Sequence, residues 1–322
     1  MACKLVIEPI FEADFEGSSY GFRPKRGAKD AVSKIKKHLR AGRTVVYDAD
    51  LSSYFDTIPH DKLLASLRLR ISDRRVLHLI QLWLQCPVYE NGRYHGGKKN
   101  KLGTPQGGVI SPLLSNIYLH NLDRIVSNSK RIFSQQGVHI VRYADDFVLM
   151  GKEISQDVLA YLQKLLSYMG LRLNAEKSML VNALTGSFNF LGFTFRFDRS
   201  WRNWKIRYWN VFPSEKAQKK LRSTLKELFC HRTHMHINEF AILLNSKIRG
   251  WMNYYHIPGV SYIRRSCEKL KYHLFVKFNQ FFKRKSQRKC KLYSRYGFER
   301  YIRKFGIIDP VQAYNLMKPV NA

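Results

Sequence analysis

Residues 138–150 read Val138-His-Ile-Val-Arg-Tyr-Ala-Asp-Asp-Phe-Val-Leu-Met150 and contain two apolar runs joined by a short polar centre. Two runs of strand length around a few turn-forming residues are typical of a β-hairpin. We therefore expect Asp145 and Asp146 at the tip of a hairpin. Two adjacent carboxylates repel one another in a tight turn, so they could be placed there for a cation. An isolated Asp-Asp pair in a loop is more often solvated surface, however, and the sequence context must decide.

A further carboxylate is predicted on a neighbouring strand. The stretch Thr44-Val-Val-Tyr-Asp-Ala-Asp-Leu51 is β-branched and alternating, and Asp50 lies at its end. Oxygen ligands without His or Cys favour magnesium, which is usually shared with substrate phosphates. Two such ions, about 4 Å apart, could activate a 3′-hydroxyl and stabilise a leaving pyrophosphate.

The remaining pattern predicts an α+β domain followed by a helical one. Helical spacing is found at 28–42, 61–85, 112–128 and 156–170, strands are expected at 188–197 and 204–212, and the pattern is helical from about 214 onward. Runs of strands and helices followed by helices alone indicate two domains. We place them at residues 1–197 and 198–322.

The charge of the chain is unevenly distributed. Its 322 residues include 56 Lys and Arg against 24 Asp and Glu, a formal net charge of +32, and 45% are hydrophobic, which is enough to fold. Residues 1–200 hold 29 basic and 18 acidic groups, whereas residues 201–322 hold 27 and 6. A basic surface of this kind indicates nucleic acid, and an anionic membrane surface is the alternative.

Cysteine usage and hydropathy indicate the compartment. None of the five cysteines forms a C-x-x-C pair, so neither a disulfide framework nor a structural zinc is expected. No apolar run approaches the roughly 18 residues of a membrane span, and the N-terminus is unlike a signal peptide. We expect a soluble, cytoplasmic protein without membrane attachment; the sequence carries no signal for an oligomeric state.

Several blocks of sequence together resemble a known family. They are Ser19-Tyr-Gly-Phe-Arg-Pro24, Asp50-x4-Phe-Asp56, Gly103-Thr-Pro-Gln-Gly-Gly108, Ser111-Pro-Leu-Leu-Ser-Asn-Ile-Tyr-Leu119, Tyr143-Ala-Asp-Asp146, Leu173-Asn-Ala-Glu-Lys177, Phe190-Leu-Gly-Phe193 and Ile248-Arg-Gly-Trp-Met-Asn-Tyr-Tyr255. In this order they resemble the reverse transcriptase/maturase of group II introns, with the last block similar to its maturase (thumb) region. The resemblance implies a right-hand polymerase palm, an antiparallel sheet with helices, with partial fingers, followed by an all-helical basic thumb.

The resemblance assigns the catalytic carboxylates. It implies that Asp50, Asp145 and Asp146 are the catalytic ligands of two magnesium ions, with Asp146 the more peripheral. Asp48 and Asp56 flank them, and for these two we expect hydrogen-bonding roles at a turn or a helix start instead of metal ligation.

The resemblance also implies residues that bind the incoming nucleotide. Phe55 matches an aromatic that excludes the 2′-hydroxyl of ribonucleotides, and Gln106 matches a glutamine beside the nucleotide and template. Arg23 matches an arginine that meets the triphosphate, for which its fork of donors is suited. Either Arg26 or Lys29 would supply a second cation.

Further residues are expected to bind phosphates and the primer. Lys177 could neutralise phosphate near the palm, although a solvated lysine is an equal alternative. The predicted primer grip consists of Phe190, Leu191, Gly192 and Phe193.

The C-terminal region interleaves cations with aromatics. Phe275, Phe278 and Phe282 have helical spacing and are expected to form core. The predicted RNA-binding cations beyond them are Lys283, Arg284, Lys285, Arg288 and Lys289.

The resemblance implies RNA and nucleotide partners: an RNA template, group II intron RNA, a DNA primer or target, and deoxynucleoside triphosphates. Family members usually carry a further fingers segment before the block that begins here at Leu5, so we expect part of the fingers to be missing. A Cys/His-rich endonuclease domain is also not expected. The alternative function is an RNA-binding maturase with an idle palm, which would assist intron folding without polymerisation.

Overall fold

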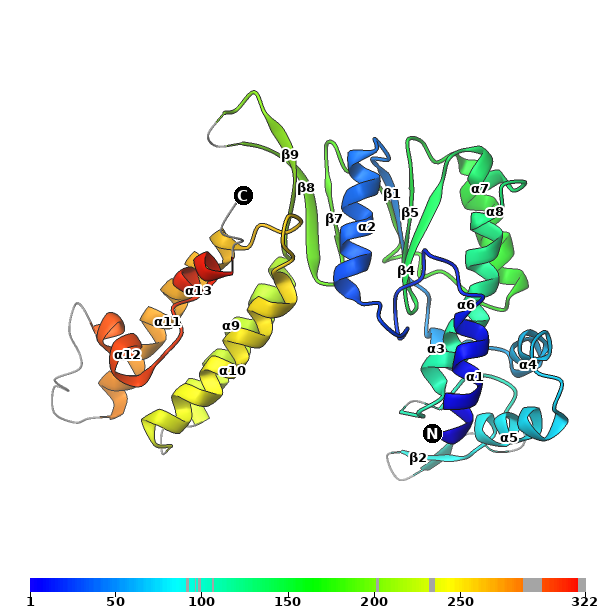
Figure 1. Cartoon of the computed structure of the whole chain (residues 1–322), viewed down its shortest axis with the longest axis horizontal. Coiled ribbons are helices and arrows are strands. Elements are labelled where there is room, and N and C mark those ends of the chain that lie inside the picture. Colours follow the sequence, from blue (N-terminus) through cyan, green and yellow to red (C-terminus); the bar gives the residue numbers. More distant parts are fainter. Residues whose placement is uncertain are drawn as a thin grey trace. The chain divides into compact units, whose positions relative to one another are not determined.

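A computed structural model describes residues 1–90, 93–95, 97, 100–105, 107–200, 203–231, 235–285 and 297–317. The chain divides into two compact units, residues 1–186 and 187–322 (Figure 1). The division that we placed after residue 197 would cut a strand of the second unit. None of the helices that the structure describes combines the length and the apolar character that a membrane crossing requires.

The first unit is built on a four-stranded antiparallel sheet of order β4-β5-β1-β6 (Figure 1). Its strands are β1 (Val45–Ala49), β4 (His139–Tyr143), β5 (Asp146–Gly151) and β6 (Met179–Asn182). The predicted hairpin is confirmed, because β4 pairs with β5 from His139 opposite Met150 to Tyr143 opposite Asp146. β1 pairs with both β5 and β6, so the strand that leads to Asp50 is central.

Helices pack around this sheet. They are α1 (Ala2–Glu12), α2 (Ala28–Arg40), α3 (Tyr54–Thr57), α4 (His60–Arg68), α5 (Arg74–Leu84), α6 (Ser111–Ser127), α7 (Ile132–Gln135) and α8 (Gln156–Tyr168); β2 (Val88–Glu90) and β3 (Arg93–His95) form a separate hairpin. The stretch 61–85 contains two helices instead of one. As expected, α6 is a buried helix, and Pro112 in its first turn suits a helix start.

The second unit combines a three-stranded sheet with helices. Its elements are β7 (Ser187–Phe190), β8 (Phe193–Arg199), β9 (Arg207–Pro213), α9 (Glu215–His231), α10 (Ile237–Tyr255), α11 (Arg264–Lys285), α12 (Gly297–Phe305) and α13 (Pro310–Leu316). Our prediction of one strand over 188–197 is wrong. Leu191 and Gly192 have φ values of 50° and 78° and turn the chain into a hairpin, as a two-residue turn with positive φ does.

Aromatic side chains form the core of the helical part. The ring of Phe229 lies 4.9 Å from that of Phe278 and 5.0 Å from that of Phe240. Phe278 is fully buried and Phe282 is buried, which confirms the expectation that these two residues form core. Phe275, predicted with them, is only half-buried. Beyond residue 214 the described elements are all helical, as predicted.

Candidate active site

The three carboxylates singled out in the sequence lie where β1 ends, in the β4–β5 loop and where β5 begins. β1 and β5 are antiparallel with Ala49 opposite Phe147, so one step further along the register Asp50 lies across from Asp146. Asp145 belongs to the two-residue loop that joins β4 to β5. Strand pairing therefore gathers side chains that are about 95 residues apart in the sequence.

The loop that carries Asp145 has an uncommon backbone conformation. Ala144 has a φ of 56°, in the left-handed region where the first position of a two-residue hairpin loop usually has glycine. A non-glycine residue in this region persists only where the surroundings impose it, and such positions cluster at functional sites. The geometry of this turn is therefore imposed by its neighbours.

Burial and neighbouring negative charge raise the pKa values of three carboxyl groups at this site. Burial, followed by the charges of Asp146 and Asp50, raises the pKa of Asp48 to about 6. Asp146 is exposed at the surface, yet the protein atoms around it and the charges of Asp145 and Asp50 raise its pKa to about 6. Burial and Asp50 also raise the pKa of Asp145. The nearest balancing charge is Lys177, whose Nζ lies 3.4 Å from Oδ2 of Asp50.

This concentration of negative charge is suited to a divalent cation. The donors are carboxylate oxygens, which suit magnesium, and a cation among them would favour the ionised forms. Within the described ranges, no three His, Cys, Asp or Glu side chains are gathered closely enough to hold an ion as they stand. For Asp48 we expected a hydrogen-bonding role, and its charge in addition interacts with those of Asp146 and Asp50. The sequence signal for this interaction was the spacing of two between Asp48 and Asp50, which places both side chains on one face of a strand.

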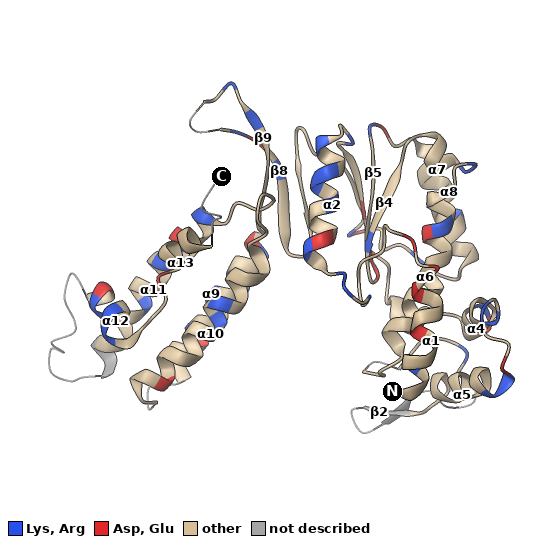
Figure 2. Cartoon of the chain, in the orientation of Figure 1, with Lys and Arg blue, Asp and Glu red and all other residues tan. Residues whose placement is uncertain are grey.

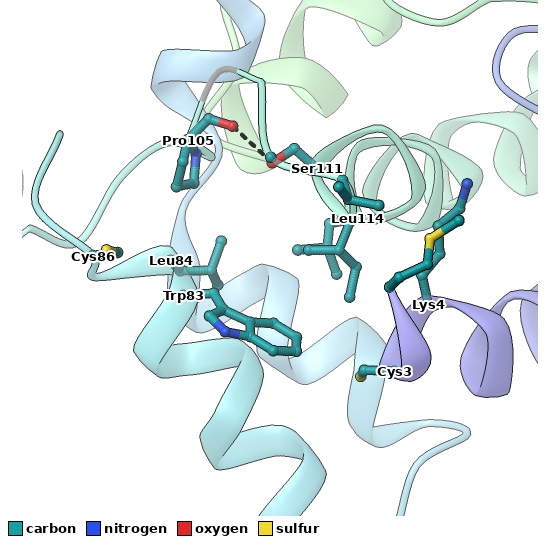
Figure 3. A pocket seen from close by; sticks show the side chains of 12 residues that line it. Cys3, Lys4, Trp83, Leu84, Cys86, Pro105, Ser111 and Leu114 are labelled. Atoms are coloured by element: carbon teal, nitrogen blue, oxygen red, sulfur yellow. Dashed lines mark hydrogen bonds between the residues drawn. The ribbon is translucent and has the colours of Figure 1, made fainter.

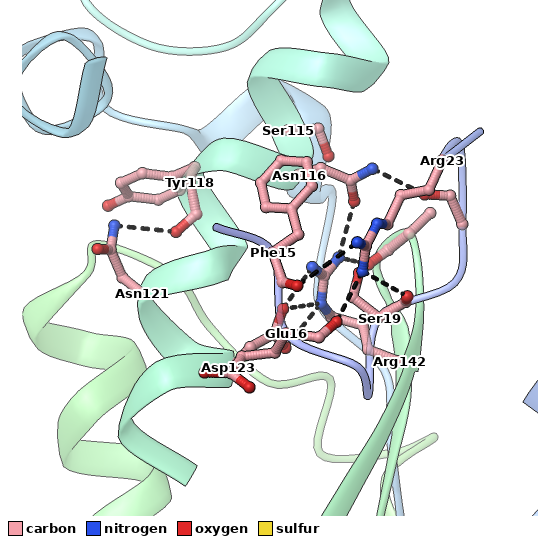
Figure 4. Close-up of polar contacts among 12 residues, drawn as sticks. Phe15, Glu16, Ser19, Arg23, Ser115, Asn116, Tyr118, Asn121, Asp123 and Arg142 are labelled. Atoms are coloured by element: carbon pink, nitrogen blue, oxygen red, sulfur yellow. Dashed lines mark hydrogen bonds and ion pairs between the residues drawn. The ribbon is translucent and has the colours of Figure 1, made fainter. Parts of the chain in front are cut away.

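A fully buried ion pair lies next to the turn formed by Ala144 and Asp145 and supports it (Figure 4). The guanidinium of Arg142 and the carboxylate of Asp123 are both 0% exposed and bond through Nη2 and Oδ2 at 2.6 Å. Nη1 of Arg142 donates to the carbonyl oxygen of Ala144 at 2.8 Å and to Oδ1 of Asn116 at 2.9 Å. These charge-assisted bonds fix the position of the turn. A charged residue in an otherwise apolar strand was the signal for Arg142 in the sequence.

The Ser19–Pro24 block packs directly against the same turn. Asn116 donates its Nδ2 to the carbonyl of Gly21 at 2.7 Å, and the backbone N–H of Tyr20 donates to the carbonyl of Arg142 at 2.9 Å. A Cβ added to Gly21 would lie 2.2 Å from the backbone nitrogen of Ala144. The approach of backbone to backbone at this point requires glycine.

Arg23, which we expected to meet the triphosphate, is buried within this block. Its Nε and Nη2 donate to the carboxylate of Glu12, and its Nη1 donates to the carbonyls of Glu16 and Ser19. Its side chain is 3% exposed. A contact with triphosphate stays a prediction, and it requires the guanidinium to leave these partners. Lys29, in the first turn of α2, is exposed.

The second cation candidate, Arg26, is also engaged. Its Nη1 donates to the carbonyl of Gly17 at 3.0 Å, and its guanidinium carbon lies 5.6 Å from the centroid of the Tyr20 ring. Both arginines thus support the loop that packs against the Asp145 turn. Of the two candidates, Lys29 has the more exposed side chain.

The loop that contains the expected nucleotide-binding glutamine is attached to α3. The backbone N–H of Thr104 donates to the carbonyl of Phe55 at 2.7 Å, and that of Gly103 donates to the carbonyl of Ile58 at 2.8 Å. Gln106 itself lies outside the described residues. The expected 2′-excluding aromatic, Phe55, is half-buried and is therefore fixed beside the start of the glutamine loop.

An apolar pocket of about 270 Å³ lies next to this loop (Figure 3). Trp83 and Leu84 of α5 and Leu114 of α6 line it. Oγ of Ser111 donates to the carbonyl of Pro105 at 2.8 Å and so joins the loop to the start of α6. The lining also includes one charged side chain, that of Lys4, and none of the three candidate carboxylates.

The Leu173–Lys177 block supports Asp50. The backbone N–H of Asn174 donates to the carbonyl of Asp50 at 2.8 Å, and the N–H of Asp50 donates to Oγ of Ser178 at 3.2 Å. The side chain of Lys177 is 67% exposed, so its pair with Asp50 contributes only up to about 1 kcal/mol to stability. It remains accessible to an anionic ligand.

The expected primer grip forms the turn between β7 and β8 in the second unit. Tyr254 donates its hydroxyl to the carbonyl of Leu191 at 3.1 Å, and the rings of Phe193 and Tyr255 lie 4.9 Å apart. A Cβ on Gly192 would lie 2.7 Å from the hydroxyl of Tyr255. The maturase-like block on α10 therefore holds the primer-grip turn, a contact that sequence reasoning did not predict.

Figure 2 shows Lys and Arg along the helices of the second unit. α11 contains eight Lys or Arg and one Glu. Lys283, Arg284 and Lys285 form its last turn, and the positions of their side chains lie outside the described structure. Arg288 and Lys289 fall in the stretch that the structure does not describe.

Two family models match the chain. Residues 1–195 match the reverse transcriptase (RNA-dependent DNA polymerase) family, and residues 218–297 match the group II intron, maturase-specific domain. The chain belongs to the reverse transcriptase family.

The proteins to which the chain is similar include one encoded by a group II intron. Protein YkfC of Escherichia coli (strain K12) is 36% identical over 252 residues, which cover 67% of this chain and 65% of that protein. Group II intron-encoded protein LtrA of Lactococcus lactis subsp. cremoris is 40% identical over 135 residues, 42% of this chain and 22% of the relative. An uncharacterized 91 kDa protein in a cob intron of Schizosaccharomyces pombe is 28% identical over 78% of this chain and 39% of its own length. The matches thus span between 22% and 65% of these relatives. The chain combines a reverse transcriptase domain with a group II intron maturase domain.

Proposed function

We propose that this chain is an RNA-directed DNA polymerase that adds deoxynucleotides to the 3′-hydroxyl of a primer. The observation that carries the proposal is the placement of Asp50, Asp145 and Asp146 at the same end of the paired strands β1 and β5. Membership of the reverse transcriptase family supports the reaction class. The raised pKa values of Asp145 and Asp146, caused by burial and then by neighbouring carboxylates, support a site that accepts cations.

The residues at the site have complementary roles in this reaction. Asp50 and Asp145 would hold two magnesium ions, with Asp146 at the periphery, because all three supply hard oxygen ligands. Bound magnesium would supply activation of the hydroxyl and neutralisation of the leaving pyrophosphate. Lys177, which is exposed beside Asp50, adds a positive charge for a substrate phosphate. Phe55 would exclude the 2′-hydroxyl of a ribonucleotide.

The second unit would hold RNA. Residues 201–322 contain 27 basic and 6 acidic groups, and the maturase-specific match lies within them. Neutralising phosphates with Lys and Arg releases counterions and drives binding that weakens as salt rises. The partners would be the template with its DNA primer and structured group II intron RNA, in intron splicing and mobility.

The test is extension of a DNA primer on an RNA template, with deoxynucleotides, in magnesium and in EDTA. We expect extension only with magnesium, together with RNA binding that weakens as salt rises. Salt-sensitive RNA binding without any extension would contradict the polymerase and leave a maturase with an idle palm. Loss of both would contradict the whole proposal.

A further inference from the structure

The second unit contains an open pocket of about 440 Å³, and none of the candidate active-site residues lines it. It lies between the three-stranded sheet and the first turns of α9 and α11. Its lining includes Arg196, Phe212, Glu215, Tyr262, Arg265 and Lys269. Its volume falls in the range of roughly 300–1,000 Å³ that is usual for small-ligand sites. We call it the β8–α11 pocket.

Positive side chains outnumber negative ones at this pocket. Arg196, Arg265 and Lys269 line it together with the carboxylate of Glu215, and Arg196 is paired with Asp198. Arg265 and Lys269 are exposed and lie one helical turn apart, and none of the ion pairs in the described part of the chain involves either. Like charges at this spacing repel one another. An anion between them would relieve that repulsion.

One wall of the pocket is fixed before any ligand binds. Arg196 donates from Nε and Nη2 to the carboxylate of Asp198 at 2.6 and 2.9 Å, and Nδ2 of Asn210 donates to the same carboxylate at 2.7 Å. The guanidinium carbon of Arg196 lies 5.2 Å from the centroid of the Phe212 ring. A wall that is already ordered loses little side-chain entropy on binding.

An aromatic ring lies beside the two cations. Tyr262 is 43% exposed and lines the pocket. Its backbone is held in place by a hydrogen bond from its N–H to the carbonyl of Val211 at 2.7 Å. Its ring packs edge-on against Tyr208, with centroids 5.3 Å apart. An exposed aromatic next to phosphate-binding cations is the arrangement on which unpaired bases stack.

We propose that the β8–α11 pocket binds one unpaired nucleotide of a single-stranded RNA segment. Its phosphate would contact Arg265 and Lys269, and its base would stack on Tyr262. A base inside a duplex is covered by neighbours on both faces, so the pocket distinguishes single strands from duplexes. The inference rests on the proposed RNA binding of this unit.

The test compares binding of labelled oligouridine with binding of an RNA duplex of equal length by the full chain. We expect Tyr262→Ala to weaken oligouridine binding about tenfold and to leave duplex binding within twofold of the unaltered chain. Tyr262→Phe, which keeps the aromatic ring, should bind oligouridine with unchanged affinity. Arg265→Ala with Lys269→Ala should weaken oligouridine binding more than the matched control, Lys220→Ala with Lys226→Ala, which removes two exposed cations of α9 outside the pocket.

Equal losses in the two double variants, or unchanged oligouridine binding by Tyr262→Ala, would overturn the pocket. Should Tyr262→Ala fail to fold, photocrosslinking of single-stranded RNA that contains 4-thiouridine to the unaltered chain tests the same proposal. A crosslink to the Tyr262 peptide supports the pocket, and crosslinks only elsewhere overturn it. Primer extension is a separate readout, so the pocket can fail while the proposed polymerase stands, and the reverse.

Discussion

Gly21→Ala should disturb the position of the turn that carries Asp145 while leaving the rest of the fold in place. The added Cβ would lie 2.2 Å from the backbone nitrogen of Ala144 and 2.9 Å from the carbonyl carbon of Tyr143. Both atoms are backbone of the turn that carries Asp145. Neither can move away as the end of a flexible side chain could.

The size of the effect follows from the distance. Cβ atoms essentially never approach other atoms within 3.0 Å, so the backbone around Ala144 must shift by at least about 0.8 Å. A misplacement of about 1 Å at reacting groups can reduce the rate about 100-fold. The overpacking itself should cost about 1–3 kcal/mol of stability. We therefore expect primer extension by Gly21→Ala to fall about 100-fold.

The assay is single-nucleotide addition to a primer under single-turnover conditions. Gly17→Ala is the matched control, because a Cβ there meets no atom within 4 Å; we expect it to extend primers at the normal rate. RNA affinity should be unchanged in both variants, since most of the net positive charge lies in residues 201–322, which hold 27 basic and only 6 acidic groups. Extension by Gly21→Ala within a few-fold of the unaltered chain would refute the reasoning.

Three further predictions concern the buried pair, the primer grip and pH. Asp123→Asn leaves the charge of Arg142 buried without a counter-charge, so urea denaturation should show a loss of about 3–5 kcal/mol in the free energy of unfolding; a loss below 1 kcal/mol would contradict the pair's role. Gly192→Ala places a Cβ 2.7 Å from the Tyr255 hydroxyl at a φ of 78°, so the KM for primer should rise about tenfold, and adding Tyr255→Phe should restore part of it. Burial, together with nearby positive charge, lowers the pKa of His38 to about 4. The unfolded chain therefore binds a proton at His38 as pH falls from 6.5 to 4 while the folded chain does not, and the free energy of unfolding should decline across this window. His38→Gln should flatten that decline, and an unchanged slope would contradict it.

Local pattern was sufficient to predict the elements on which the candidate catalytic carboxylates are placed. The apolar runs around Asp145 and Asp146 predicted the β4–β5 hairpin, and the alternating stretch before Asp50 predicted β1. Only the fold, however, shows that β1 lies between β5 and β6. The pairing partner of a strand depends on residues far away in the chain, which a period of two does not specify.

Other features escaped prediction because they depend on tertiary contacts. Residues 188–197 are rich in aromatics and were predicted as one strand, so the turn at Leu191 and Gly192 was missed. A glycine within a strand pattern indicates a turn or bulge, and Gly192 was therefore the available signal. The triphosphate contact of Arg23 stays a prediction, but the bonds of its guanidinium to Glu12 and to backbone carbonyls were not predicted. The buried partner of Arg142 is 19 residues away on a helix, and no sequence spacing connects the two.

The central claim is that the carboxylates at the end of β1 and in the β4–β5 turn catalyse nucleotidyl transfer. Addition of one deoxynucleotide to a primer in magnesium, by Asp145→Asn beside Glu153→Gln, tests it most directly. Glu153 is an exposed carboxylate just beyond the opposite end of β5, so the control removes one charge from the same hairpin. We predict that Asp145→Asn abolishes addition with RNA affinity unchanged, while Glu153→Gln adds the nucleotide at the normal rate. Addition that survives Asp145→Asn at a comparable rate would contradict the account.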